Sequence, residues 1–505
     1  METVTKTLEF SLFVNGRWQP AKSGETFDVV NPATGEVVAK VAKADVNDVD
    51  AAVRAARTAF ESGVWSRLAP EYRALILLNF AKKILENADE LVYLEVISSG
   101  GTVRRVANSD ILQICDLLQN AAKFLKEYPY VETLPSLPFP GPSTNQVWRE
   151  PIGVCAAICA WNFPMLLAMW KVVPALAMGN AIVVKPASNT PLSTLKLAQL
   201  AAEAGVPAGV FNVVAGPGAS VGEALVTHPE VDKVAFTGST EVGRRIMQLA
   251  AGSVKRVTLE LGGKSPAIVL PDADLHVAIP GILFGVFLHA GQICESGTRV
   301  LVHDDIYDEV VQRLAELAQR IPIGNPLSET TGMGPVISMK QFETILEYIE
   351  SGKAEGARLV CGGQPVRVAG CEGGCFIEPT IFADVTNDMK IAREEIFGPV
   401  LSVIRYRDVK EAVSIANDTI YGLAAGIWTR DANEAFRIAR YLKAGTIWIN
   451  DWHMLRSDAP FGGYKQSGFG REMGKHALDE YTQVKHVHQS LVHHVEERPW
   501  YQMLF

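Results

Sequence analysis

The chain of 505 residues is poor in positive charge. Lys and Arg total 47 against 56 Asp and Glu, which gives a formal net charge of −9. No basic run or stripe offsets this acidity, so the sequence argues against binding to nucleic acid. With 48% hydrophobic and 20% charged residues, the composition is that of a folded globular protein and excludes a disordered or fibrous chain.

Long hydrophobic runs are also missing. The most apolar segment, residues 152–184, is interrupted by Asn162, Pro164, Lys171, Pro174 and Asn180. A membrane span needs about 20 mostly apolar residues, so no membrane partner is expected. The first six residues lack the basic and apolar regions of a secretory signal. We therefore expect a cytoplasmic protein.

Seven cysteines are ordinary usage for this length, and their odd number without a secretory signal argues against a disulfide framework. Cys371 and Cys375 flank an expected hairpin loop, but a zinc site there would need a second ligand pair at a suitable spacing. No metal site is predicted.

What is present is a regular alternation of strands and helices. Apolar β runs begin near residues 153, 182, 211, 234 and 256, with a helical pattern in each gap. Repeated βα units of this length predict a parallel sheet covered by helices on both faces. Ligands of such sheets bind beyond the carboxyl ends of the strands.

The regions on either side of these βα units have different sequence patterns. β hairpins are expected in the first forty residues, followed by a helix capped by Asp45 and another over about 72–87. The proline-rich stretch 128–143 and a strand over 144–149 indicate a boundary or an extended excursion. A second α/β region covers 272–449. Its expected helices are 281–288 and 307–320, and its expected strands are 400–406, 424–428 and 445–449.

Three side chains are candidates for chemistry. Cys294 follows an apolar helix in a glycine-bracketed turn, where it is either an accessible nucleophile or a buried core cysteine. Glu260 ends a strand and is either a general base or a surface or capping residue. Asn162 precedes a helix and either donates to an oxyanion or caps the helix.

Two glycine-containing turns, 216–218 and 238–243, each follow a strand. Backbone N–H groups and the helix dipole favour phosphate at such turns. Neither has the spacing G-x-G-x-x-G, so the common dinucleotide fingerprint is absent. Two such turns in one sheet nevertheless favour a nucleotide ligand.

Seven ordered motifs together resemble the aldehyde dehydrogenase superfamily. They are Trp161-Asn162-Phe163-Pro164, Lys185-Pro186-Ala187-Ser188, Phe236-Thr237-Gly238-Ser239-Thr240, Glu260-Leu261-Gly262-Gly263-Lys264, Gly291-Gln292-Ile293-Cys294, Glu395-Ile396-Phe397-Gly398-Pro399 and Pro460-Phe461-Gly462-Gly463. The resemblance implies that an aldehyde is oxidised to its acid with NAD or NADP. Cys294 then matches the nucleophile, Asn162 the oxyanion hole, and Glu260 the base that activates water rather than a coenzyme A acceptor.

The resemblance also implies the cofactor and substrate residues. The cofactor set is Ile158, Trp161, Lys185, Ser188, Gly218, Phe236, Ser239, Leu261, Glu395 and Phe397. The substrate tunnel is expected to be lined by Phe163, Leu167, Trp170, Leu288, Ile293, Leu455 and Phe461. These side chains favour an apolar aliphatic or aromatic aldehyde, a preference that nearby Arg456 could overturn. Lys171 and Glu472 match positions of a proton path.

The implied fold is α/β: a Rossmann-like parallel-sheet cofactor domain (1–128 and 151–262), an α/β catalytic domain (263–479), and a β oligomerisation arm with a C-terminal tail (129–150 and 480–505). We therefore expect a homo-oligomer, a dimer or a dimer of dimers. The aromatic tail 499–505 is expected to pack against a neighbouring subunit or near the tunnel mouth.

Three positions depart from the family pattern. Ser188 replaces a frequent Glu, which would repel a 2′-phosphate, so we expect NADP to be accepted. His289 replaces a common Asn and is given no catalytic role. Glu295 follows the nucleophile directly, and we expect it to point away because adjacent side chains diverge.

Two alternatives remain for the function. The same Cys294 and Glu260 could hydrolyse activated esters without a cofactor, as a thiol esterase. A catalytically silent structural or binding relative would also keep the fold, although the intact set of Asn162, Glu260 and Cys294 argues against it.

Overall fold

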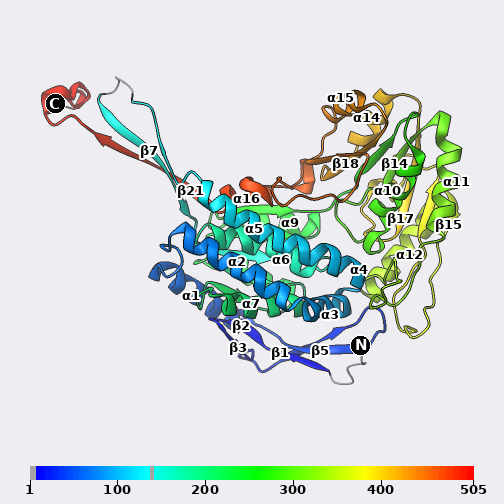
Figure 1. Cartoon of the computed structure of the whole chain (residues 1–505), viewed down its shortest axis with the longest axis horizontal. Coiled ribbons are helices and arrows are strands. Elements are labelled where there is room, and N and C mark those ends of the chain that lie inside the picture. The colour runs from blue at the N-terminus through cyan, green and yellow to red at the C-terminus, as the bar shows by residue number, and fades with distance from the viewer. Residues whose placement is uncertain (1–6, 137–140, 505) are drawn as a thin grey trace.

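Four β-sheets organise the chain in the computed structural model, which describes residues 7–136 and 141–504 (Figure 1). Part of the proline-rich stretch, residues 137–140, therefore lies outside the described residues, as do residues 1–6 and 505. Figure 1 shows the first half of the chain and the segment from about residue 266 to 449 as two lobes, with an arm extending away from the first. After residue 449 the chain returns to the first lobe and then enters the arm.

The first lobe is built on an eight-stranded sheet with a parallel centre, as the βα alternation predicts. In spatial order its strands are β20 (Gly468–Phe469), β12 (Arg256–Glu260), β11 (Lys233–Thr237), β8 (Val154–Ile158), β9 (Ala181–Lys185), β10 (Phe211–Val213), β2 (Leu12–Val14) and β3 (Arg17–Gln19). The five strands from β12 to β10 run parallel, and the outer ones pair antiparallel.

Helices cover this sheet and one another. They are α1 (Val46–Ser62), α2 (Pro70–Glu86), α3 (Ala88–Ser99), α4 (Val103–Arg105), α5 (Ile111–Glu127), α6 (Pro164–Ala177), α7 (Leu192–Ala204), α8 (Glu223–Thr227) and α9 (Thr240–Ala251). The expected cap at Asp45 is present as a capping box with Asp48. Helix α6 is buried along its whole length, because it lies under α2, α5 and α7.

The second lobe contains a seven-stranded sheet. Its order is β15 (Arg358–Cys361), β16 (Thr380–Ala383), β17 (Val400–Tyr406), β14 (Arg299–His303), β13 (Pro266–Val269), β18 (Ala424–Trp428) and β19 (Thr446–Ile449). Around it lie α10 (Leu275–Phe287), α11 (Tyr307–Ala318), α12 (Met339–Ala354), α13 (Lys390–Arg393), α14 (Val409–Asn417) and α15 (Ala432–Ala439). The expected helix 281–288 is only the last part of α10, because the Asp274 side chain caps the helix six residues earlier.

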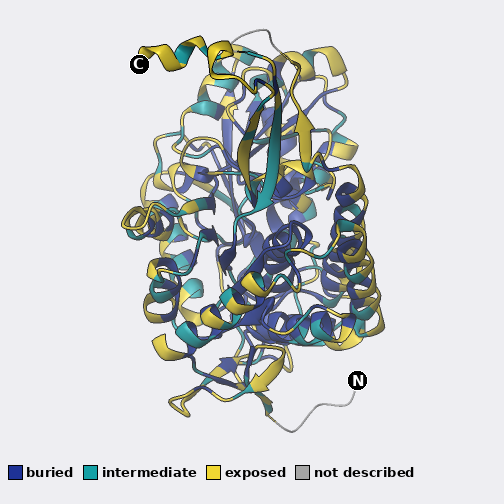
Figure 2. Ribbon diagram, turned by 90° about the vertical axis from the view of Figure 1, so that its left-hand side faces the viewer, coloured by how far each residue is buried: buried dark blue, intermediate teal, exposed yellow. Residues whose placement is uncertain are grey.

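The arm is a three-stranded antiparallel sheet of β6 (Val131–Thr133), β7 (Ser143–Pro151) and β21 (Thr482–Ser490). Helix α16 (Gly474–Glu480) leads into β21, a strand that the polar, His-rich sequence did not suggest. Figures 1 and 2 show the arm projecting from the body with much of its surface exposed, and the carboxyl end lies at its tip. The remaining small sheet joins β1 (Leu8–Phe10), β5 (Val37–Ala42) and β4 (Thr26–Val30).

Within residues 7–136 and 141–504, no helix is both long and apolar enough to cross a membrane.

Candidate active site

The carboxyl ends of three adjacent parallel strands bring candidate residues together. In the sheet register, Thr237 at the end of β11 pairs with Glu260 at the end of β12. On the other side, Phe236 pairs with Ile158 at the end of β8, which leads directly into the loop 159–163. Residues far apart in sequence thus meet at one edge of the sheet, the edge at which such folds bind ligands.

Cys294 reaches this edge from the second lobe, on a sharply turned loop. After α10, His289 and Ala290 both adopt left-handed backbone conformations, with φ of 52°. Gly291 follows with φ +71°, and a side chain there would collide with the Gly398 carbonyl. The loop packs closely against the other lobe: a side chain on Gly263 would meet the Cys294 carbonyl oxygen.

Two cavities meet at the thiol. One, of about 220 Å³, contains Trp161, Ser239, Glu260 and Glu395 in its wall. The other, of about 60 Å³, lies among the expected substrate residues. Cys294 and Asn162 line both cavities. All seven cysteines are described, and Cys294 alone among them is not buried, which disfavours the alternative of a core cysteine.

Glu260 is a buried carboxyl in the larger cavity. It is 4% exposed, so it is not a surface residue, and its Oε2 has no hydrogen-bond partner among the described residues. Burial, followed by the nearby charge of Glu472, raises the pKa of this carboxyl well above its ordinary value. A side chain on Gly462 would collide with Glu260 Oε1. Once ionised, such a group is a strong base for a carboxylate.

Asn162 lines both cavities together with Cys294 and has one free amide hydrogen. Its Nδ2 donates to the Gln292 carbonyl at 2.9 Å, and the amide carries a second hydrogen. No hydrogen bond of the described residues uses the Cys294 backbone N–H. Asn162 does not cap α6, whose N-cap residue is Phe163. The two N–H groups can therefore both turn to an oxygen bound beside Sγ.

A buried network of ionisable side chains supports this loop from behind. The guanidinium of Arg105 lies 4.1 Å from the centre of the Phe163 ring and donates to the Asn162 carbonyl at 3.4 Å. Arg105 also pairs with buried Asp110 at 3.3 Å. Glu95 accepts from the Met165 N–H at 3.3 Å. The backbone that carries Asn162 is thus held on both sides by groups that sequence patterns did not single out.

The residues expected at the cofactor divide into two groups. Five line the larger cavity: Trp161, Ser239, Leu261, Glu395 and Phe397. The other five do not line it and lie on or after the neighbouring strands: Ile158, Lys185, Ser188, Gly218 and Phe236. Ile158 pairs with Lys185 across β8 and β9, and Ser188 Oγ donates to the Gly216 carbonyl at 2.9 Å. Two further cavity residues were not among the expected cofactor residues: Thr237, which belongs to a motif, and Gln341, which belongs to none.

This donor set suits a nicotinamide dinucleotide. Ser239 caps α9, so the positive end of a twelve-residue helix faces the cavity where Gly238 and Ser239 line it. The buried Glu395 carboxyl accepts from the Gly263 N–H at 3.0 Å, and burial raises its pKa to about 7. Its other oxygen lies so close to Gly262 that any side chain there would collide with it. Trp161 and Phe397 add an aromatic pair with ring centres 5.1 Å apart. The N-terminus of α9 at Ser239 suits a phosphate, the Glu395 carboxyl suits ribose hydroxyls, and the aromatic pair of Trp161 and Phe397 suits a flat ring.

The smaller cavity contains six of the seven expected substrate residues: Phe163, Leu167, Trp170, Leu288, Ile293 and Leu455. Phe461 does not line it and instead packs on the Trp170 ring, with centres 5.3 Å apart. Arg456 is no part of the lining either, because its exposed side chain pairs with Asp458 at 2.8 Å. The remaining lining residues, which sequence reasoning missed, are Ser109, Gln113, Leu166, Glu295 and His453.

Glu295 corrects one expectation. Its side chain does not point away from the nucleophile: Cys294 Sγ donates to Glu295 Oε2 at 3.1 Å. The two residues lie in a turn rather than a strand, so their side chains do not diverge. Burial, and then the charge and hydrogen bond of Glu295, raise the pKa of the Cys294 thiol well above its ordinary value. The adjacency of an acidic residue to the cysteine was the available signal.

Lys171 and Glu472 lie behind Glu260 as a buried ion pair. Lys171 Nζ donates to Glu472 Oε1 at 2.8 Å and to Thr237 Oγ1 at 2.6 Å. Both side chains are nearly inaccessible to solvent. The two charges act on Glu260 in opposite directions, because Glu472 raises the pKa of its carboxyl and Lys171 lowers it.

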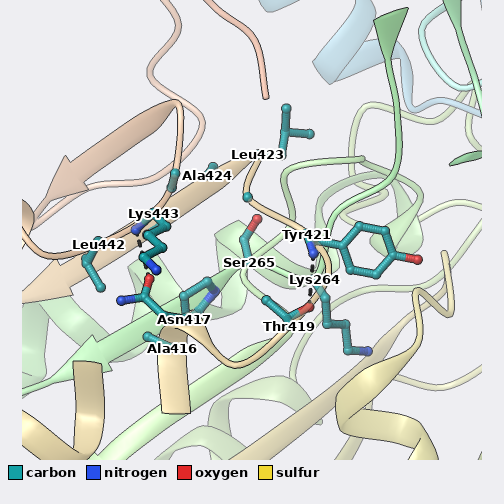
Figure 3. A pocket seen from close by; sticks show the side chains of 14 residues that line it. Lys264, Ser265, Ala416, Asn417, Thr419, Tyr421, Leu423, Ala424, Leu442 and Lys443 are labelled. Atoms are coloured by element: carbon teal, nitrogen blue, oxygen red, sulfur yellow. Dashed lines mark hydrogen bonds between the residues drawn. The ribbon is translucent and has the colours of Figure 1, made fainter. Parts of the chain in front are cut away.

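A third cavity, drawn in Figure 3, lies apart from these two in the second lobe, among Lys264, Asn417 and Tyr421. Its volume of about 10 Å³ is enough for a single water. Figure 3 shows the amine of Lys264 directed away from Ser265, and burial lowers the pKa of this amine to about 7. The cavity is too small for a substrate.

Comparison with known proteins gives one consistent result. Residues 18–487 match the model of the aldehyde dehydrogenase family. The chain is 48% identical to a putative aldehyde dehydrogenase, DhaS, of Bacillus subtilis, covering 96% of this chain and 97% of that one. Among solved structures, it resembles the aldehyde dehydrogenase KauB from Pseudomonas aeruginosa with a TM-score of 0.93 and 45% identity, over 96% and 97% of the two chains.

A second structural relative was solved with ligands. It is the indole-3-acetaldehyde dehydrogenase AldA of P. syringae in complex with NAD+ and IAA, at a TM-score of 0.93 and 43% identity, covering 96% of this chain and 98% of that one. The match of family model, sequence and fold extends over nearly the whole chain. The protein described here therefore belongs to the aldehyde dehydrogenase family and is an oxidoreductase that acts on aldehydes.

Proposed function

We propose that this enzyme oxidises an aldehyde to the free carboxylic acid through a thioester on Cys294, with Glu260 as the base that activates water. The observation that carries the proposal is the thiol at the junction of two cavities. One cavity suits a nicotinamide dinucleotide and the other an aldehyde. Asn162 faces the junction and Glu260 lies in the wall of the first cavity.

In the first step, the thiol of Cys294 gives its proton to a water molecule in the cavity, and the resulting thiolate Sγ bonds to the aldehyde carbon. The carbonyl oxygen takes up negative charge as its double bond opens. The free amide hydrogen of Asn162 and the Cys294 N–H stabilise that charge, giving a thiohemiacetal. Arg105 contributes by holding the Asn162 backbone in place.

A nicotinamide cofactor held by Trp161, Ser239, Glu395 and Phe397 would supply the hydride acceptor. Loss of hydride from the thiohemiacetal carbon would leave a thioester on Cys294. Ionised Glu260 then removes a proton from water, whose oxygen attacks the thioester carbon. The C–S bond breaks, the acid leaves and the sulfur is restored. The buried, raised-pKa carboxyl of Glu260 supports this role, because a stronger base abstracts the water proton more readily.

For the cofactor, NAD+ in the P. syringae relative supports the same nucleotide here. We propose that NADP is accepted as well. Ser188 carries no charge to repel a 2′-phosphate, and the Lys185 amine at the end of β9 adds a cation, although burial lowers its pKa to about 8. Ser188 would exchange its bond to the Gly216 carbonyl for one to the phosphate.

For the substrate, the aromatic and aliphatic wall supports an aldehyde with an apolar body. No Lys or Arg lines that cavity among the described residues, so a short aldehyde bearing a carboxylate has no cation to bind. The esterase alternative shares Cys294 and Glu260, but it does not explain the larger cavity, because ester hydrolysis needs no nucleotide.

We also propose a cytoplasmic homo-oligomer, and the arm and tail support the assembly. The proposed domains keep the boundaries expected from the sequence, except that β20 of the proposed catalytic domain joins the sheet of the first lobe. Strand β6 forms one edge of the arm, and Met503 and Leu504 are each 85% exposed at its tip. Such an apolar end favours contact with a second copy of the chain. Light scattering of the full chain tests this, because the measured mass should exceed the monomer mass of 54.9 kDa.

The function is tested by reduction of NAD+ and NADP+ with benzaldehyde, hexanal and succinic semialdehyde. Cys294→Ala should lower kcat by about 10⁴-fold or more, because no other group can carry the acyl intermediate. The matched control Cys361→Ala removes a thiol remote from both cavities and should keep full activity. Comparable activity of Cys294→Ala would contradict the mechanism, and a clear preference for succinic semialdehyde would contradict the apolar tunnel.

A further inference from the structure

The substrate-side cavity contains one polar pair that the mechanism above does not use. Glu295 Oε1 lies 3.1 Å from Nδ1 of His453, and each side chain is only 6% exposed. His453 belongs to the loop after β19, whereas Glu295 follows the nucleophile, so the pair joins two separate segments at the cavity wall. The ring of Phe284 lies edge-to-face against the imidazole, with centres 5.4 Å apart.

The hydrogen bonds of this pair fix the position of its proton. Burial opposes ionisation of Glu295, but the hydrogen bonds that it accepts from His453 and Cys294 favour the carboxylate, and the pKa of this carboxyl is lowered. A carboxylate only accepts, so Nδ1 of His453 carries the hydrogen that it donates. Oε2 accepts from Cys294 Sγ at the same time. In the neutral imidazole, Nε2 is then a bare acceptor.

That acceptor has nothing to bind in the protein. His453 Nε2 is buried and has no hydrogen-bond partner among the described residues. Most of the other side chains around the cavity are apolar, including Leu288, Ile293 and Leu455. A buried polar atom without a partner costs free energy, so its persistence beside a substrate cavity calls for a partner that arrives with the ligand.

We propose that Glu295 and His453 form a subsite for a hydrogen-bond donor on the non-reacting part of the aldehyde, either a hydroxyl or an ammonium group. This inference rests on the proposed function and specifies its substrate class. The apolar wall holds the body of the aldehyde, Cys294 attacks its carbonyl carbon, and His453 Nε2 accepts from the donor.

The charge of the Glu295–His453 pair also affects which substituent on the aldehyde binds best. With a neutral imidazole, the pair carries one negative charge in a cavity whose lining, among the described residues, contains no Lys or Arg. An ammonium group gains attraction in addition to the hydrogen bond, whereas a carboxylate on the substrate is repelled. The expected order of preference is therefore aminomethyl, then hydroxymethyl, then methyl or ethyl, then carboxylate.

The experiment compares kcat/KM of the intact enzyme with NAD+ for matched benzaldehydes. The substituents are hydroxymethyl, ethyl, aminomethyl and carboxylate at the 3- or 4-position. The hydroxymethyl compound should exceed its ethyl isostere by about tenfold at the better position. His453→Phe should remove that ratio, and an unchanged thermal unfolding midpoint of the variant shows that it is folded.

Two further variants separate the contributions. Glu295→Gln removes the charge, so the aminomethyl compound should lose its advantage over hydroxymethyl. Leu455→Val, a matched change in the apolar wall, should affect hydroxymethyl and ethyl compounds equally. Ratios are compared within each variant, so any effect of Glu295→Gln on Cys294 cancels.

Equal rates for hydroxymethyl and ethyl compounds at both positions would overturn the subsite but leave the proposed function standing. A ratio that survives in His453→Phe would overturn the role of His453. If no aldehyde is oxidised by the unmodified enzyme, the proposed function fails first and the subsite fails with it.

Discussion

The two sides of Cys294 treat buried carboxyl groups in opposite ways. On the cofactor side, burial raises the pKa of both Glu260 and Glu395, and Glu395 reaches about 7. On the substrate side, Glu295 is equally buried, yet its pKa is lowered because His453 donates to it. Burial alone therefore does not set the behaviour of a carboxyl here; the partner does.

This difference assigns different work to similar side chains. A carboxyl with a raised pKa and an unpartnered oxygen is suited to take a proton from water. A carboxylate fixed between a thiol and an imidazole is suited to hold charge and orient its neighbours. The comparison can be broken by removing each carboxyl in turn, since equal consequences would mean that the two sides do not differ.

The largest effect is expected from Glu260→Gln. Steady-state turnover should fall about 10²- to 10⁴-fold, because water loses its base. Addition of the thiol and hydride transfer do not need this residue, so a rapid burst of reduced cofactor should remain. Stopped-flow absorbance at the reduced-nicotinamide band measures both phases.

Glu295→Gln is the matched control for that experiment, since it changes the carboxyl on the other side of the same thiol. It should not accumulate a thioester after the burst. A stalled burst in Glu295→Gln, or unchanged turnover in Glu260→Gln, would contradict the division between the two sides.

A smaller effect is expected at the adenosine end of the cofactor side. Ser188→Glu introduces a carboxylate beside the proposed 2′-phosphate position and should lower kcat/KM for NADP+ about tenfold or more, by like-charge repulsion. The value for NAD+ should be kept, because ribose hydroxyls can donate to a carboxylate. Initial rates with each cofactor at a fixed aldehyde concentration give the ratio, and an equal loss with both cofactors is the opposite result.

Local sequence patterns predicted the buried strands of the two large sheets well. The apolar runs near 182 and 211 correspond to β9 and β10, and the expected strands 400–406 and 424–428 have the bounds of β17 and β18. These strands are buried on both faces, so their sequences read as continuous apolar runs. Strand β21 could not be predicted in this way, because its exposed, polar residues are held by pairing with β7 rather than by burial.

The same contrast holds for the site. Trp161, Leu261, Glu395 and Phe397 could be placed at one cavity because each belongs to a recognisable motif. His453 belongs to none, and its position depends on a loop that returns from β19 to the nucleophile. Glu295 was visible in the sequence, but its direction depends on the backbone turn at Cys294. Tertiary contacts between separate segments carry no local signal.

The most delicate test concerns the thiol itself. Glu295→Gln should make Cys294 react with iodoacetamide at lower pH, because Glu295 raises the pKa of the thiol and the amide does not. Burial and the charges of Glu395 and Glu260 also raise this pKa, and they remain in the variant, so the profile should shift without reaching that of a free cysteine. The pH dependence of the alkylation rate measures the shift, since Cys294 is the one partly exposed cysteine of the chain and the other six are buried.

The control for that shift is Glu316→Gln, which removes the same charge from an exposed position on α11 and should leave the profile in place. If the pH profile of alkylation for Glu295→Gln is unchanged or moves to higher pH, the Glu295 carboxylate does not raise the pKa of the Cys294 thiol. The two sides of Cys294 would then differ in shape but not in charge. A shift confined to Glu295→Gln instead ties the reactivity of the nucleophile to the residue that also holds His453, so substrate recognition and thiol activation would be adjusted by one side chain.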